Sequence, residues 1–221
     1  MPVLNHQPSG DRTLTQRTPA RTHRTFRKLV MPNGSHPAIR RVRRQGNLPT
    51  IHGNKLWKSS CLLIDYLQKH PGDVCDSVID VGCGWGIAGI WCARELGAEV
   101  TSVDADANVF PYLDVVAELN GASTTHCVKR FEQLSTAQLA RFDVLIAADI
   151  CFWDDLVDPV FNMVNRAVKA GVKRILIADP ERPTFHEMAQ RCVDAHCADV
   201  LEWQTRGSIE ARGAIMVIEN A

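Results

Sequence analysis

The segment VIDVGCGWGIAG, residues 78–89, constrains the fold of this chain more than any other part of the sequence. An apolar run is followed by glycines at every second position, Gly82, Gly84 and Gly86, and then turns apolar again. Glycine lacks a Cβ atom, so the backbone can bend sharply there and a ligand can approach the main chain closely. We therefore expect a strand, a tight turn and a helix whose free N–H groups face a ligand.

Strand-like and helix-like segments alternate after this turn. We expect strands at 76–82, 99–104, 124–130, 142–149 and 173–179, with helices at 87–96, 109–120, 136–142, 158–170 and 184–196 between and after them. Two further β-like runs, 199–205 and 214–219, have no helix between them. This order predicts an α/β fold with a doubly wound, mostly parallel seven-stranded sheet and an antiparallel finish. An additional helix is expected at 59–70, before the first strand of the sheet.

Charge divides the chain into two parts. Residues 1–50 carry ten Lys and Arg against one acid, although the net charge of the 221 residues is zero. We expect residues 1–50 to form a basic, partly disordered N-terminal arm, with a short strand or helix at 24–31, and residues 51–221 to form one domain. The arm could dock on the acidic body or on a substrate, attract nucleic acid, or act as a mitochondrial targeting segment.

Composition narrows the class of protein further. No apolar run is long enough to span a bilayer and no secretion signal opens the chain, so we expect a monomeric cytoplasmic protein without a membrane partner, or a mitochondrial matrix protein if the source is eukaryotic. The eight cysteines form no C-x-x-C pair and fall mostly in apolar segments, which favours small buried side chains. The spacing of His186, Cys192, His196 and Cys197 matches no zinc pattern, so we assign no metal.

The glycine spacing also bears on the kind of ligand. A dinucleotide site usually reads G-x-G-x-x-G, whereas V-I-D-V-G-C-G-W-G resembles the first motif of class I S-adenosylmethionine (SAM) methyltransferases. That cofactor carries an ammonium group, for which Asp80 is a candidate partner. Asp104 ends the next strand, where a carboxylate can accept hydrogen bonds from both ribose hydroxyls. An NAD site would also use an acid at this place, so Asp104 alone does not discriminate.

Three other segments resemble a narrower family. FDVLIAADICFWDDLVD (142–158), ILIADPERPTF (175–185) and LWKSS (56–60) are similar to segments of the seven-β-strand protein lysine methyltransferases, in particular the electron-transfer-flavoprotein β-subunit lysine methyltransferase group. The resemblance covers roughly residues 55 to 221. It implies a SAM cofactor and a protein substrate. The residues that we expect to contact the cofactor are Trp57, Asp80, Gly82, Cys83, Gly84, Gly86, Asp104, Ala105, Phe131 and Ala148.

The same resemblance suggests catalytic residues. Asp149 and Phe152 stand where the group has Asp-x-x-Tyr, although Phe152 has no hydroxyl and Trp153 takes a position that is acidic in the relative. Asp149 could orient a lysine amine or help to receive its proton, while Phe152 and Trp153 could enclose the alkyl stem and attract a cationic head. Arg182, which follows the fifth strand, could bind an acidic partner or pair with a neighbouring carboxylate.

Other functions stay open at this level. The acceptor could be a small molecule or RNA, although DICFW lacks the prolines of the Asn/Asp-Pro-Pro-aromatic segment that RNA amine methyltransferases often use. A different class, an NAD-binding oxidoreductase, would share the glycine turn and Asp104. A SAM-binding module without activity is a further alternative. Binding of the demethylated cofactor, or of NAD, would separate these classes.

Overall fold

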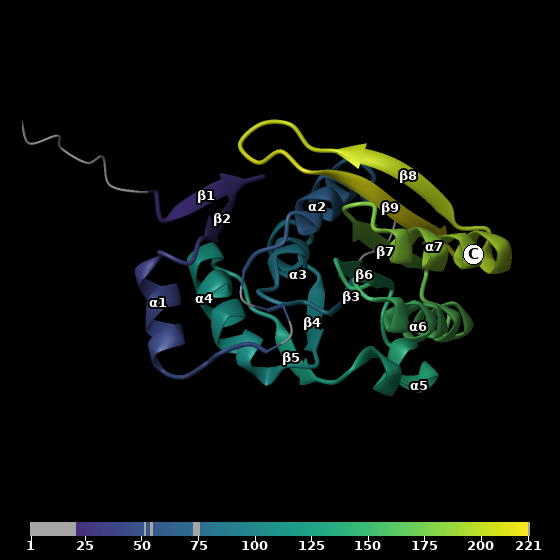
Figure 1. Ribbon diagram of the computed structural model, residues 1–221, viewed down its shortest axis with the longest axis horizontal. Coiled ribbons are helices and arrows are strands. Elements are labelled where there is room, and N and C mark those ends of the chain that lie inside the picture. Colours follow the sequence, from purple (N-terminus) through teal and green to yellow (C-terminus); the bar gives the residue numbers. More distant parts are fainter. Residues whose placement is uncertain (1–20, 51, 54, 73–75, 221) are drawn as a thin grey trace, which may run out of the picture.

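The computed structural model describes residues 21–50, 52–53, 55–72 and 76–220. The expected α/β architecture is confirmed: a seven-stranded sheet has the order β5-β4-β3-β6-β7-β9-β8 (Figure 1). Its strands are β3 (Ser77–Val81), β4 (Glu99–Asp104), β5 (Thr125–Val128), β6 (Val144–Ala148), β7 (Arg174–Asp179), β8 (Asp199–Gln204) and β9 (Arg212–Glu219). The first five are parallel, and β9 pairs antiparallel with both β7 and β8.

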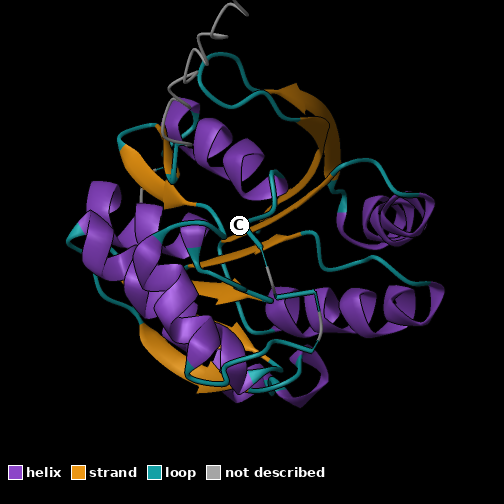
Figure 2. Cartoon of the chain, turned by 60° about the vertical axis from the view of Figure 1, so that its left-hand side comes forward, coloured by secondary structure: helices purple, strands orange, loops and turns teal. Residues whose placement is uncertain are grey.

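Helices cover both faces of this sheet, which Figure 2 shows as strands between two groups of helices. Helices α2 (Ser59–Lys69), α3 (Ile87–Trp91) and α4 (Phe110–Asn120) share one hydrophobic cluster with alternate strand residues such as Val78 and Ile146. Helices α5 (Thr136–Leu139), α6 (Val157–Lys169) and α7 (Pro183–His196) pack on the other face with Ile79 and Leu145. Because successive side chains of a strand point to opposite faces, burial on both sides produces the uninterrupted apolar runs in the sequence.

Local sequence accounts for most element boundaries. The helix expected over 87–96 begins as α3 and continues as a wider turn over Cys92–Leu96, and it ends at Gly97 with φ at 70°. Gly121 ends α4 in the same left-handed conformation, which glycine adopts at little cost. The strand expected at 124–130 is shorter, since β5 is an edge strand with mostly exposed residues.

Part of the basic extension is built into the domain. Residues 23–32 form a hairpin of strands β1 (His23–Phe26) and β2 (Leu29–Pro32), followed by helix α1 (Pro37–Arg44). Phe26, Leu29, Met31, Ile39 and Val42 are buried in the same cluster as α2 and α4. The hydrophobic core of the domain therefore includes residues 21–50 in part, whereas the sequence placed the domain boundary at residue 50. The partial disorder expected for this extension cannot be compared with the structure over residues 1–20, which lie outside the described part of the chain.

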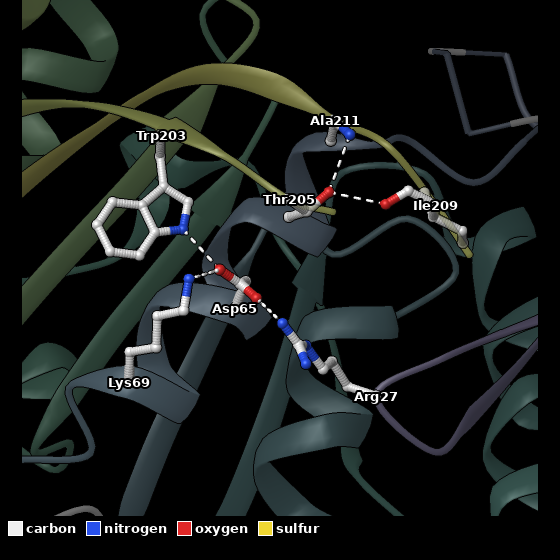
Figure 3. Close-up of polar contacts among 7 residues, drawn as sticks. All are labelled: Arg27, Asp65, Lys69, Trp203, Thr205, Ile209 and Ala211. Atoms are coloured by element: carbon white, nitrogen blue, oxygen red, sulfur yellow. Dashed lines mark hydrogen bonds and ion pairs between the residues drawn. The ribbon is translucent and has the colours of Figure 1, made fainter. Parts of the chain in front are cut away.

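A buried carboxylate ties the hairpin to the domain (Figure 3). Asp65 of α2 is fully buried and accepts hydrogen bonds from Arg27 in the β1–β2 turn, from Lys69 at 2.7 Å and from Trp203 of β8 at 3.1 Å. Burial raises the pKa of Asp65, but the hydrogen bonds from these three donors outweigh it and lower the pKa. At least this part of the basic extension docks on the acidic body of the same chain.

Three further observations concern membrane spans, cysteines and metal ligands among the described residues. No helix there is both long and apolar enough to cross a membrane. Of the cysteines in these residues, Cys61, Cys92, Cys151 and Cys192 are buried, whereas Cys197 is exposed. In the same residues no group of three or more His, Cys, Asp or Glu is arranged to hold a metal ion.

Candidate active site

A pocket opens at the carboxyl ends of β3 and β6, where the strand order of the sheet reverses. Its volume of about 350 Å³ is typical of a small-molecule site. In an open α/β sheet this reversal leaves a crevice between the loops that follow the two strands, and ligands bind there. The sequence-predicted residues that line the pocket are Trp57, Gly82, Gly84, Asp104, Ala105, Phe131, Ala148, Asp149, Phe152 and Trp153.

The three glycines of the turn have different roles. Gly82, Gly84 and Gly86 all have positive φ, at 66°, 52° and 71°. A Cβ on Gly82 would come within 2.5 Å of Ile150, and one on Gly86 within 2.6 Å of Leu113, so these two glycines allow close internal packing. A Cβ on Gly84 would meet nothing within 4 Å, because it would stand in the open pocket. Gly84 is therefore the glycine at which a ligand can reach the main chain.

Three predicted cofactor contacts do not line the pocket: Asp80, Cys83 and Gly86. Asp80 lies beneath the turn, with only 3% of its surface exposed, and accepts the Gly89 N–H at 3.1 Å. Burial raises its pKa from 3.8 to about 7; the Gly89 N–H opposes this rise and the charge of Asp104 adds to it. Within this structure Asp80 fixes the first turn of α3, and its expected contact with an ammonium group stays a prediction.

Asp104 projects into the pocket from the end of β4. Its Oδ2 accepts the Gly84 N–H at 3.0 Å and its Oδ1 accepts the Asp106 N–H at 3.0 Å. Burial raises the pKa of Asp104, although these backbone N–H groups act in the opposite direction. Since each carboxylate oxygen has two lone pairs, the side chain can still accept hydrogen bonds from two ligand hydroxyls.

A second pair of carboxylates shares one guanidinium at the ends of β6 and β7. Arg182 Nη1 lies 2.9 Å from Asp149 Oδ1 and 2.6 Å from Asp179 Oδ2. The Arg182 backbone N–H also donates to Asp179 Oδ1 at 2.8 Å. Burial raises the pKa of Asp179 to about 6, while its bonds to Arg182 act to lower it. Burial alone would lower the pKa of Arg182, but the two carboxylates outweigh that effect and raise it.

Asp149 is strained and incompletely satisfied. It is a non-glycine residue with φ at 59°, and only 8% of its surface is exposed. Its Oδ1 is paired with Arg182, but Oδ2 is buried and has no hydrogen-bond partner within the described part of the chain. A buried polar atom without a partner costs free energy unless a ligand or water satisfies it. This oxygen is therefore a candidate acceptor for a hydrogen-bond donor of the substrate.

Aromatic rings surround the same mouth of the pocket. The His52 ring lies edge-on to Phe152 at 4.8 Å, to Trp153 at 5.5 Å and to Trp57 at 6.0 Å between centroids. Trp57 Nε1 donates to the His52 carbonyl at 2.9 Å, and Arg182 stands 6.0 Å from the Trp57 ring. Trp153 is half exposed, at 53%, so its ring is available at the entrance.

No sequence pattern indicated His52, Gly53 or Ile150 as lining residues, and for Arg182 the sequence suggested only two general roles. His52 and Gly53 reach the pocket because their loop is tied to the turn, where Trp85 Nε1 donates to the Gly53 carbonyl at 2.8 Å. This contact joins positions 32 residues apart, and no local pattern at 52–53 predicts it. Phe131, which the sequence suggested, and its neighbour Glu132 both line the pocket after β5.

Comparisons with known proteins agree with this architecture. Residues 78–171 match the family model described as a methyltransferase domain. The chain is 28% identical over 130 residues to the electron transfer flavoprotein beta subunit lysine methyltransferase of Rattus norvegicus, covering 58% of this chain and 50% of the relative. It is also 26% identical over 136 residues to a ubiquinone biosynthesis O-methyltransferase of Serratia proteamaculans, covering 53% and 55%. The chain thus spans about half the length of the curated relatives that it matches.

Solved structures share the fold at lower identity. A SAM-dependent methyltransferase from Agrobacterium tumefaciens superposes with a TM-score of 0.57 at 16% identity, over 75% of this chain and 64% of that one. A ribosomal protein L11 methylase from Lactobacillus delbrueckii gives 0.53 at 16% identity, over 74% and 78%. At this level of identity the superpositions establish the fold.

Proposed function

Because the chain contains a class I SAM-dependent methyltransferase domain, with SAM as its cofactor, we propose that it transfers a methyl group to the side-chain amine of a lysine in a protein. The observation that carries the proposal is the buried, unpaired Oδ2 of Asp149 beside the aromatic mouth of the pocket. The similarity to lysine methyltransferases of the electron transfer flavoprotein beta subunit supports the same acceptor.

The pocket residues fit the cofactor. Asp104 offers carboxylate lone pairs for the ribose hydroxyls, Gly84 leaves open space against the main chain, and Phe131 and Ala105 provide apolar surface for a base. No Cβ obstructs the turn at Gly84, as a site for a ligand held against the backbone requires. When bound, SAM supplies an electrophilic methyl group on a positively charged sulfur. The assignment of these contacts belongs to the proposal.

The residues at the mouth would align the acceptor amine. Methyl transfer is an in-line displacement that depends on alignment and on exclusion of water. In the proposed complex Asp149 Oδ2 accepts a hydrogen bond from the amine N–H, so the nitrogen lone pair is directed toward the methyl group. Phe152 and Trp153 enclose the alkyl stem, and their ring faces attract the positive charge that the amine carries before and after reaction.

Arg182 would position Asp149 without touching the substrate. Its guanidinium is held between Asp149 and Asp179, and it remains charged because the guanidinium does not lose its proton in proteins. The ion pair fixes Oδ1 of Asp149, which leaves Oδ2 as the acceptor for the substrate. Phe152 supplies no hydroxyl, so the polar contact to the amine in this proposal comes from Asp149 alone among the catalytic residues predicted from sequence.

A small-molecule acceptor is the second candidate. The similarity to a ubiquinone biosynthesis O-methyltransferase favours it, and the mostly apolar pocket would accept an aromatic ring as well as a lysine stem. The two candidates differ in what carries the methyl group after reaction. Cell lysate incubated with methyl-labelled SAM and the enzyme should yield a labelled protein band whose digest contains methyllysine. Label confined to small solutes or RNA would overturn the lysine proposal.

An Asp149→Asn variant tests the mechanism. Asparagine tolerates the left-handed backbone conformation of residue 149, so the turn is kept while the acceptor charge is lost. We expect kcat to fall by about 10²–10⁴-fold, as for loss of a positioned acid or base, with the affinity for S-adenosylhomocysteine unchanged. Asp155→Asn, an exposed acid nearby, is the matched control and should retain activity. Equal activity of both variants would contradict the role of Asp149.

A further inference from the structure

A second cavity lies behind the active-site pocket. It has a volume of about 310 Å³ and is bounded by the hairpin β1–β2, by residues 55–58 and by the loop that precedes β9. Met31, Leu56 and Ile209 give it apolar walls, and Arg24, Lys55 and Lys58 also line it. Trp57 lines both this cavity and the active-site pocket, so the two cavities are adjacent.

Positive charge continues from this cavity along α1. Ile39 and Val42 of α1 are buried, while Arg40, Arg41, Arg43 and Arg44 are exposed. Arg43 connects the helix to the cavity: its Nη2 lies 3.5 Å from the place that a Cβ on Gly34 would take, and Gly34 lines the cavity. The surface formed by α1, the cavity and Trp57 is here called the basic groove.

The cations of the basic groove are not neutralised within the described part of the chain. No ion pair there involves Arg24, Arg43, Lys55 or Lys58, whereas Arg27 and Lys28 of the same hairpin pair with Asp65 and Glu95. Lys55 Nζ lies 4.0 Å from the centroid of the Trp57 ring. A set of unpaired cations around an apolar cavity is complementary to an acidic chain that also carries an apolar side chain.

We propose that the basic groove binds an acidic, extended segment of the protein substrate, with an apolar side chain of that segment in the second cavity. This inference rests on the proposed lysine methylation. The segment follows α1 and the cavity, and the target lysine passes Trp57 to reach Asp149. Specificity then comes from residues that flank the lysine, while the active-site pocket recognises only the lysine itself.

The groove favours a peptide over nucleic acid. Residues 36–48, which include all of α1, contain no Phe, Trp or Tyr, so α1 offers no such ring for base stacking, and the tryptophans of the groove are Trp57 and Trp85. Trp85, which also lines the cavity, is 98% buried and stacks on Tyr112 at 5.1 Å between centroids. The apolar walls of Met31, Leu56 and Ile209 suit an aliphatic side chain.

The test uses peptides of defined composition with the full chain and S-adenosylhomocysteine. One fluorescein-labelled peptide carries three glutamates and a leucine before a single lysine; the second has glutamines in place of the glutamates; the third has alanine in place of the leucine. Fluorescence anisotropy should show tightest binding of the first peptide, with an affinity that falls as salt rises. Equal binding of the three peptides would overturn the proposal.

Charge reversal locates the site. The variant Arg24→Glu/Arg43→Glu should bind the acidic peptide at least about tenfold more weakly, since two attractive contacts become repulsive. The control Arg141→Glu/Lys169→Glu reverses two exposed cations elsewhere and should bind it as the unaltered chain does. Equal loss in both variants would contradict a specific groove. If a 20-nucleotide single-stranded RNA binds more tightly than the acidic peptide and only its binding responds to Arg24→Glu/Arg43→Glu, the groove is a nucleic-acid surface and the peptide proposal fails.

Failure of this inference can be separated from failure of the proposed function. Each variant is also titrated with S-adenosylhomocysteine by calorimetry, and this affinity should be unchanged because neither pair lines the active-site pocket. The acidic peptide is then tested for methylation of its lysine. If the acidic peptide binds tightly but is not methylated, the result supports peptide binding in the basic groove and contradicts lysine as the methyl acceptor. If the acidic and glutamine peptides are methylated equally, the result supports lysine as the acceptor and contradicts peptide binding in the basic groove.

Discussion

Replacing Gly84 by alanine should separate the cost of backbone strain from the loss of ligand binding. Gly84 has φ at 52°, and a Cβ there meets no protein atom within 4 Å. The fold therefore loses only the conformational term, about 1–2 kcal/mol for an L-residue in the left-handed region. For a chain of this size that corresponds to a fall in Tm of about 2–8 °C.

Gly84→Ala should also weaken cofactor binding, independently of its effect on stability. In the proposed complex the cofactor lies against the main chain at Gly84, and the added methyl group takes the space that the cofactor needs. Overpacking of this kind costs about 1–3 kcal/mol. At about 1.4 kcal/mol per tenfold, this is a loss of roughly 5–150-fold in affinity for S-adenosylhomocysteine, which isothermal titration calorimetry can measure.

Gly121→Ala provides the matched control for Gly84→Ala. Gly121 ends α4 with φ at 62°, and a Cβ there also meets nothing within 4 Å, but Gly121 does not line the pocket. Both variants should lose a similar amount of stability in thermal unfolding, and only Gly84→Ala should lose cofactor affinity. Binding of S-adenosylhomocysteine by Gly84→Ala at the unaltered affinity would refute the placement of the cofactor at this turn.

Two further predictions concern buried carboxylates. Burial raises the pKa of Asp80 to about 7, so the folded chain loses stability as pH rises from about 4 to 7 and Asp80 ionises. In urea unfolding, the free energy of unfolding of Asp80→Asn should therefore increase relative to that of the unaltered chain across this pH range. Asp65 behaves in the opposite way, because hydrogen bonds lower its pKa. Its contribution to the stability of the folded chain is therefore present above pH 4 and is lost as pH falls. Asp65→Asn should cost about 2 kcal/mol at pH 7, less than the 3–5 kcal/mol typical of breaking a buried pair, because Arg27 and Lys69 can return to water. If the difference in free energy of unfolding between either variant and the unaltered chain did not change with pH, the role assigned to that carboxylate would be contradicted.

The glycine turn and the strand ends could be predicted because they depend on local sequence. Strand periodicity identified all seven strands, and parallel strands place their carboxyl ends at one edge of the sheet. For that reason Gly84, Asp104 and Asp149 could be assigned to one pocket although they come from three strands. Asp80 shows the limit of this reasoning, because its side chain points to the face of β3 that α3 covers and lies beneath the turn.

The sequence by itself determined the α/β sheet and the position of the pocket, since these follow from strand periodicity and the glycine turn. The methyl donor was implied by the resemblance of the glycine motif to the first motif of SAM methyltransferases. Tertiary structure decided which charged groups form pairs and which remain unpaired. Arg27 and Asp65 are 38 residues apart and Arg182 and Asp149 are 33 apart, so only the folded chain pairs these groups and leaves Asp149 Oδ2 and the cations of the basic groove unpaired among the described residues. The energy of a charge depends on its neighbours in space and on its burial, and local sequence spacing specifies neither.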